Sequence, residues 1–240
     1  YQETGLAACR LAIFSGAQER VILIHWSPTS YSSSERTGLL PVSQDAVTLA
    51  DQLSQSVLAQ LPSVCSFDCL RSVTGEFFLE CFAGHAAFTL AVVMSQVPAL
   101  RPWEITHDRR FDVLAGLPIL LEGIRLGIMV AMHLGTPCQS FTMARVPAVR
   151  TLGFPLGLPD LTPSQSQLVD MGNQLVSVSV KLCLALYTAG GYFSLENPER
   201  SLLWIHPDVL ELFRLSGVAS VLVYSVSYTH LTLPTKFVVV

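Results

Sequence analysis

After Gly75 the chain alternates short, continuously apolar runs with longer segments that have helical periodicity. A strand buried on both faces reads as an unbroken apolar run, and such strands occur mainly in parallel sheets that helices cover. The alternation therefore predicts an α/β fold, Rossmann-like, with a mostly parallel sheet and helices on both faces. We expect strands at 76–82, 99–105, 128–135, 192–196 and 218–224, and helices at 85–96, 117–127, 163–189 and 206–217.

This pattern divides the chain into three parts. Residues 76–225 form the part with the predicted α/β fold, called the lobe below. Residues 1–75 form a poorly defined N-terminal extension. In the extension, 21–26 is typical of a short strand, the serine-rich stretch that follows is typical of a loop, and 45–61 has one apolar face, which predicts a helix. Residues 226–240 form the third part, a tail.

The tail contains the sequence VSYTHLTLPT at 226–235, which resembles the translation of a transposase adapter used in sequencing libraries. On this interpretation the biological chain ends near Tyr224 or Ser225, and residues 226–240 are an artefact that packs poorly. The alternative is a genuine strand, because Val226, Tyr228 and His230 alternate with small polar residues.

The composition is apolar and slightly acidic. Half of the 240 residues are hydrophobic, 13% are charged and the net charge is −4. Such a chain can bury the core of one domain, but a protein that binds nucleic acid alone normally carries a basic excess. No apolar run reaches about 18 uncharged residues, and no signal peptide is visible. We therefore expect an intracellular protein, nuclear or cytoplasmic, without a membrane segment; the oligomeric state stays open.

The six cysteines are scattered along the sequence, and only Cys65 and Cys69 lie close together. No histidine or second cysteine pair completes a zinc pattern around them. The sequence therefore predicts reduced thiols and no metal site.

Residues with reactive side chains follow the predicted strands. Ala83 and Gly84 follow the first strand, Glu104 closes the second, Cys138 follows 128–135, and Glu196 closes 192–196. Ligands in parallel sheets bind at the carboxyl ends of the strands, so one thiol and two carboxylates should lie at one edge.

Four sequences at these strand ends resemble, in order, the motifs of cytosine-C5 DNA methyltransferases: FLECFAGHAAFTLA, WEI, GTPCQSF and FSLENP. The resemblance covers about 76–200, and DMGNQL at 170–175 adds to it. The sequence departs from the family at Gly172, where the family has arginine, at Ala86 and Ala87, where its turn has glycine, and at Pro198, where it has valine.

The resemblance implies a class I methyltransferase fold that uses S-adenosylmethionine. Cys138 would be the nucleophile that adds to C6 of cytosine, and Glu196 would give N3 a proton. Glu104 would accept hydrogen bonds from the ribose of the cofactor. The remaining implied residues are Phe82, Ala83, Gly84 and Asp112 for the cofactor, and Pro137, Gln139 and Asn197 as support.

The family's arginine-rich motif, target-recognition domain and closing helix do not follow residue 200. The lobe is therefore expected to be incomplete and inactive alone. In the family those parts make much of the nucleic-acid contact, with DNA a better candidate partner than RNA.

Other interpretations stay open. Cys138 can be a structural thiol, and Arg150 can meet phosphate or be solvated. Ala86 and Ala87 favour a non-catalytic binding or scaffolding domain. A thiol hydrolase that pairs Cys138 with His133 is a further alternative, although a histidine inside an apolar strand is more typical of a core.

Overall fold

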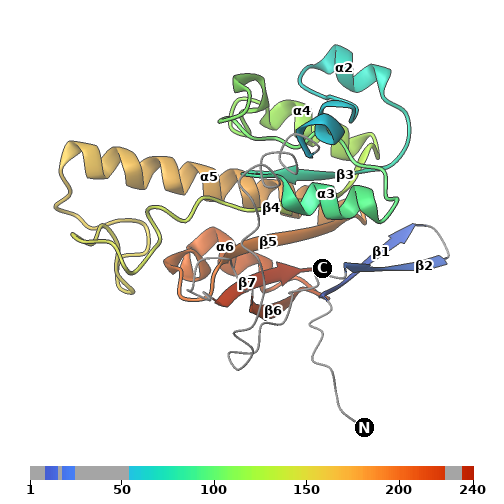
Figure 1. The fold of residues 1–240 in the computed structure, drawn as a ribbon. Coiled ribbons are helices and arrows are strands. Elements are labelled where there is room, and N and C mark those ends of the chain that lie inside the picture. The colour runs from blue at the N-terminus through green and yellow to red at the C-terminus, as the bar shows by residue number, and fades with distance from the viewer. Residues whose placement is uncertain (1–8, 16–17, 25–53, 225–233) are drawn as a thin grey trace, which may run out of the picture.

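The computed structural model describes residues 9–15, 18–24, 54–224 and 234–240 (Figure 1). Its main sheet has the order β3-β4-β5-β7-β6. β3, β4 and β5 pair in parallel, whereas β7 is antiparallel to both β5 and β6, so β7 alone runs against the other four. The chain is thus an α/β protein with a mixed, mostly parallel sheet. The strands are β3 (Phe77–Cys81), β4 (Met129–Leu134), β5 (Tyr192–Pro198), β6 (Ala219–Tyr224) and β7 (Pro234–Val239).

Helices cover both faces of this sheet, as the sequence predicted. Phe78 and Ala131 pack with Val92 of α3 in a small cluster. The next residues along the same strands, such as Leu79, point the opposite way into a larger core shared with α4, α5 and α6. The helices are α3 (Ala87–Met94), α4 (Leu117–Arg125), α5 (Pro163–Thr188) and α6 (Pro207–Leu212), with short 3₁₀ turns at Arg109–Phe111 and Leu202–Ile205.

The long helix α5 lies alongside β4 and β5 (Figure 1). It begins with a capping box between Thr162 and Gln165 and with Pro163 in its first turn. By length and composition alone α5 could cross a membrane, which is weak evidence because the helix of a protein core passes the same test. Several of its residues, among them Val176, Leu182 and Leu186, are buried in the larger core.

Two segments differ from the prediction. The expected strand at 99–105 is reduced to isolated parallel bridges from Ala99 to Phe78 and from Trp103 to Cys81. Pro102 lies between the bridges, and a proline has no N–H to continue a ladder. β5, by contrast, extends past its expected end at Glu196, because β7 pairs with it as far as Pro198.

The N-terminal part has more structure than its weak pattern indicated. A hairpin pairs β1 (Cys9–Ser15) with β2 (Gln18–Ile24), which overlaps the strand expected at 21–26. A short helix, α2 (Phe67–Ser72), was not expected. Residues 54–59 are helical, within the helix expected at 45–61, whereas the serine-rich loop lies outside the described residues.

The strand order creates a switch point between β3 and β4. From β3 the chain first passes to the 99–103 segment on one side and later returns to β4 on the other side. Ligands of open α/β sheets bind at the carboxyl ends of the strands where the order reverses in this way. At that point the Gly135 N–H donates to the Cys81 carbonyl at 3.1 Å, so the two strand ends stay together.

The C-terminal tail does not pack as expected. The prediction that 226–240 packs poorly is wrong for residues 234–240, because β7 lies between β5 and β6 and Val238 is completely buried. The sequence PTKFVV is rich in residues that favour strands, which explains how it fills this place. Residues 226–233 lie outside the described part, and the adapter origin of the tail stays a prediction.

A chain that ends at Tyr224 tests this strand. β6 reaches the sheet through β7, so the shortened chain should lose at least about 2 kcal/mol of unfolding free energy, the scale of exposing one buried valine. Urea denaturation of both chains measures the difference, and Val238→Ser in the full chain should reproduce part of it. Equal midpoints for the two chain lengths would instead support the adapter interpretation.

Candidate active site

The turn after β3 has an unusual backbone. Phe82, Gly84 and Ala86 have φ values of 57°, 51° and 56°, in the left-handed region. Only glycine adopts this region without steric cost, and a residue with a Cβ loses roughly 1–2 kcal/mol there. Ala86 is also completely buried and directly precedes α3. Ala86 is therefore strained, because its backbone has the form that suits glycine whereas its side chain is that of alanine.

Glu104 supports this turn from the next strand segment. One carboxylate oxygen, Oε2, accepts a hydrogen bond from the Gly84 N–H at 3.0 Å. The other, Oε1, accepts from the N–H and the hydroxyl of Thr106, at 3.0 and 2.8 Å. Partial burial raises the pKa of Glu104, but the hydrogen bonds from Thr106 and Gly84 outweigh it and lower the pKa overall. Glu104 is thus an ionised group that already holds the glycine turn.

The cysteine loop after β4 is fixed from two sides. The Asn197 side chain donates from Nδ2 to the Thr136 carbonyl at 2.6 Å, and the Thr136 hydroxyl bonds the Ser179 hydroxyl of α5 at 2.7 Å. Cys138 itself is half-buried, and its carbonyl accepts from the N–H groups of Phe141 and Thr142. Pro137 is half-buried and Gln139 is exposed. Cys138 therefore lies on a rigid loop and is not enclosed in the core.

Arg150 is neither a phosphate ligand nor a solvated arginine, the two possibilities that the sequence left open. Its side chain is buried and donates to Ser140, to the carbonyls of Pro155 and Val169, and to Asn173. Its guanidinium also lies 4.0 Å from the centroid of the Phe141 ring. Burial lowers the pKa of Arg150 to about 10. Arg150 therefore ties the cysteine loop to α5.

This arrangement requires a glycine at position 172. A Cβ at Gly172 would collide with the Ser140 hydroxyl and press on Arg150 and Phe141. No side chain fits at position 172, so the family's arginine has no place on this face of α5.

A row of polar side chains crosses the sheet under α3. His133 of β4 pairs in register with Glu80 of β3 and with Ser194 of β5. Its Nδ1 bonds the Ser194 hydroxyl at 2.8 Å, and its Nε2 lies 3.3 Å from Oε2 of Glu196. The Phe88 ring of α3 stacks on the imidazole at 4.4 Å between centroids. His133 is buried, as expected, but it serves as the link between Ser194 and Glu196.

Glu80 is the residue of this row that the sequence analysis missed. Only 4% of it is exposed, and Oε2 accepts hydrogen bonds from the N–H and the hydroxyl of Thr89. Burial raises the pKa of Glu80 although His133 and Thr89 act in the opposite direction, and the charge of Glu196 adds to the increase. The signal that could have found it was a carboxylate inside the apolar run FFLECF.

The structure brings most of the predicted residues to one edge. Gly84 and Glu104 are in contact, and the Cys138 loop and Asn197 are joined through Thr136. Asp112 is different, because its carboxylate accepts from Leu114 N–H at 2.9 Å and so stabilises its own turn. In the part of the chain that the structure describes, no group of three or more potential metal ligands occurs.

No protein-family model, no curated protein and no solved structure matches this chain. Any function assigned to it therefore rests on the residues at this edge of the sheet.

The strain of the β3 turn can be measured with Gly84→Ala. A Cβ at Gly84 meets nothing within 4 Å, so backbone strain is the only cost, and we expect a loss of about 1–2 kcal/mol of unfolding free energy. Gly153→Ala is the matched control, since that position is equally open and has no left-handed backbone. Urea denaturation should show a loss for Gly84→Ala alone; equal effects at both positions would contradict the strain.

The buried carboxylate predicts a pH dependence. Above 4.5, its ordinary pKa, Glu80 stays protonated in the folded chain while the unfolded chain has lost the proton, so stability falls as the pH rises toward the raised value. Glu80→Gln lacks this titration. The unfolding free energy of the variant minus that of the wild type should therefore increase as the pH rises above 4.5. A constant difference across this range would refute the prediction.

Proposed function

We propose that the chain is the cofactor-and-nucleophile lobe of a cytosine-C5 methyltransferase, which transfers a methyl group from S-adenosylmethionine to cytosine in DNA. One observation supports this function above the others. The glycine turn after β3, the Cys138 loop after β4 and Glu196 on β5 lie at the switch-point edge of a mostly parallel sheet. A class I methyltransferase arrangement of the sheet is part of the same proposal.

The residues around the glycine turn fit the methyl donor. The space over Gly84 is open, because a Cβ there would meet nothing within 4 Å. A carboxylate has about four lone-pair sites, and three of those of Glu104 are used by Gly84 and Thr106, which leaves one for a ribose hydroxyl. Phe82 and Ala83 would line the turn, and Asp112 would face the adenine. When bound, S-adenosylmethionine supplies an electrophilic methyl group.

The chain's own residues would activate the cytosine. Cys138 would add to C6 as a thiolate, which makes C5 an enamine carbon that can accept the methyl group. Glu196 would give N3 a proton as the ring takes up negative charge. Water would then take the C5 proton, the Cys138 sulfur would leave C6 and the N3 proton would return to Glu196, which restores the ring; the donor would leave as S-adenosylhomocysteine. Asn197 contributes indirectly, because it fixes the end of the loop through Thr136.

His133 would position Glu196 in this reaction. Its Nε2 and the Oε2 atom of Glu196 can share one proton, while Ser194 fixes the tautomer and the plane of the ring. The other oxygen of Glu196 is then left for the base. The same contacts disfavour the thiol hydrolase, because both ring nitrogens of His133 are already engaged, Nδ1 by Ser194 and Nε2 by Glu196.

A non-catalytic binding domain is the second candidate function. It is favoured by the strained Ala86 and by the hydrogen bond that occupies Glu104 with Gly84. Both features restrict the place where the donor would bind. Cofactor binding together with formation of a covalent cytosine adduct therefore distinguishes the two functions.

Because the lobe is expected to be inactive alone, a 5-fluorocytosine oligonucleotide tests the proposed chemistry in the chain joined to a DNA-binding domain. With fluorine at C5 the final elimination cannot occur, so a covalent adduct with Cys138 should accumulate when S-adenosylmethionine is present. Cys138→Ser should form no adduct and keep donor binding, because an alkoxide is far harder to form at neutral pH than a thiolate. Denaturing gels and mass spectrometry detect the adduct, and calorimetry measures donor binding.

The glutamate gives a second, graded result. Glu196→Gln should slow adduct formation by roughly 10²- to 10⁴-fold, the usual scale for a lost acid–base group. Glu211→Gln is the matched control on an exposed surface and should have no effect. Donor binding without adduct would favour the non-catalytic domain, and absence of donor binding would overturn the proposal.

A further inference from the structure

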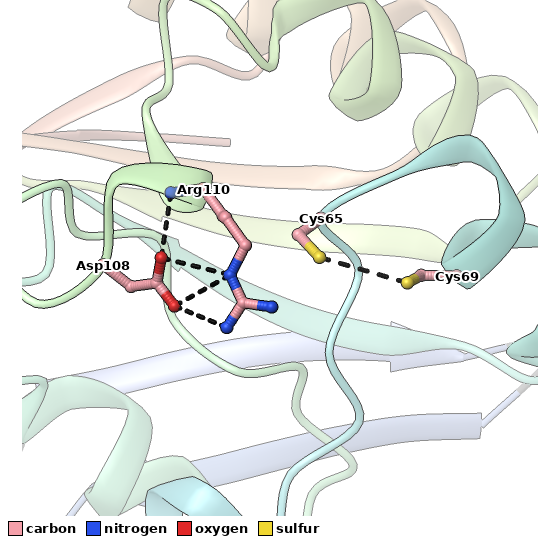
Figure 2. Close-up of polar contacts among 4 residues, drawn as sticks. All are labelled: Cys65, Cys69, Asp108 and Arg110. Atoms are coloured by element: carbon pink, nitrogen blue, oxygen red, sulfur yellow. Dashed lines mark hydrogen bonds and ion pairs between the residues drawn. The ribbon is translucent and has the colours of Figure 1, made fainter.

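We propose that Cys65 and Cys69 bind one monovalent copper ion, Cu(I), through both sulfur atoms. The two cysteines lie at the start of α2, on either side of its N-cap residue Ser66. Their Sγ atoms are 4.0 Å apart, and both side chains are partly exposed (Figure 2). This inference is independent of the proposed methyl transfer, since it uses neither Cys138 nor the switch-point edge.

The separation of the sulfur atoms suits a bridging metal better than a disulfide. Metal–thiolate bonds are about 2.3 Å long, so two sulfurs on one ion lie roughly 3.8 Å apart at a tetrahedral angle and roughly 4.6 Å apart in a linear arrangement. The observed 4.0 Å lies between these values. A disulfide instead requires about 2.05 Å, so both side chains would have to move.

The ligand set selects a soft monovalent ion. A structural zinc site needs four ligands, and no third potential ligand joins the two cysteines among the residues that the structure describes. Thiolates alone favour Cu(I), which is stable with few ligands. The proposed site is therefore a two-thiolate copper site.

Electrostatics support the same choice. Two thiolates on Cu(I) carry a net charge of −1, whereas two thiolates on a divalent ion carry none. The positive charge of Arg110 interacts with both cysteines. Asp108 holds the Arg110 guanidinium through Nε and Nη2 at 2.7–3.2 Å, from the side away from Cys65 (Figure 2). The Asp108–Arg110 ion pair thus holds a guanidinium near the cysteines, where its remaining positive field favours a complex with a net negative charge.

On binding, both thiols lose their protons and the ion enters as Cu(I), so two protons are released and no electron is transferred.

The test is an anaerobic titration of the full chain with Cu(I) against a chromophoric Cu(I) chelator. We expect the wild type to retain one equivalent, with two protons released per ion. Cys65→Ser and Cys69→Ser should each lose retention, by at least about 100-fold in apparent affinity, because a single thiolate remains. Arg110→Gln should weaken binding a few-fold, the scale of a partly exposed charge.

Controls separate this site from other thiols and from oxidation. Cys138→Ser should retain copper like the wild type, and loss of copper in that variant would overturn the assignment. Retention of Zn(II) as strong as that of Cu(I) would refute the choice of a monovalent ion. Failure to retain copper by a chain whose cysteines are reduced, as shown by thiol counting, would also overturn the site. If a serine variant does not fold, selective alkylation of the pair in the wild type gives the same comparison.

Discussion

The parallel pairing of β3, β4 and β5 determines where every other feature of this protein lies. Because the three strands run in one direction, their carboxyl ends meet at one edge, and the loops that follow them become neighbours. The register also aligns Glu80, His133 and Ser194 across the sheet. Short hydrogen bonds then join the loops, from Glu104 to the β3 turn and from Asn197 to the cysteine loop. The candidate site is a consequence of strand direction and register.

The row of polar side chains under α3 lowers the stability of the fold, because its buried members lose contact with water. A feature with such a cost indicates a role beyond packing. A buried carboxylate loses its hydrogen bonds with water. For Glu80, the two hydrogen bonds from Thr89 replace part of them. An apolar residue at this position would avoid the penalty altogether. The row ends at Glu196, whose side chain is 37% exposed, so it connects a buried carboxylate through a histidine to a carboxylate that can reach a ligand. A core built for packing alone has no need of such a connection, which is why the row supports a functional edge.

The sequence predicted the parts of this structure that depend on local pattern. Apolar runs and caps located β3, β4, α4 and α5, and side chains after strand ends indicated Cys138 and Glu104. It could not predict contacts that depend on register, such as Glu80 beside His133, because periodicity does not say which residues of two strands are opposite. The burial of Arg150 was not predicted for a similar reason, because it requires carbonyls from two separate segments, at Pro155 and Val169.

The turn at Ala86 links the fold to the choice between the two candidate functions. Its left-handed backbone persists although alanine disfavours it, so the surrounding structure must impose it. The neighbouring constraints are the buried start of α3 and the hydrogen bond from Ala86 N–H to the Ala83 carbonyl at 2.7 Å. A backbone form that suits glycine is thus held with an alanine in it. This is expected if the shape of the turn serves a ligand, whereas a purely structural turn could relax to a form that alanine accepts.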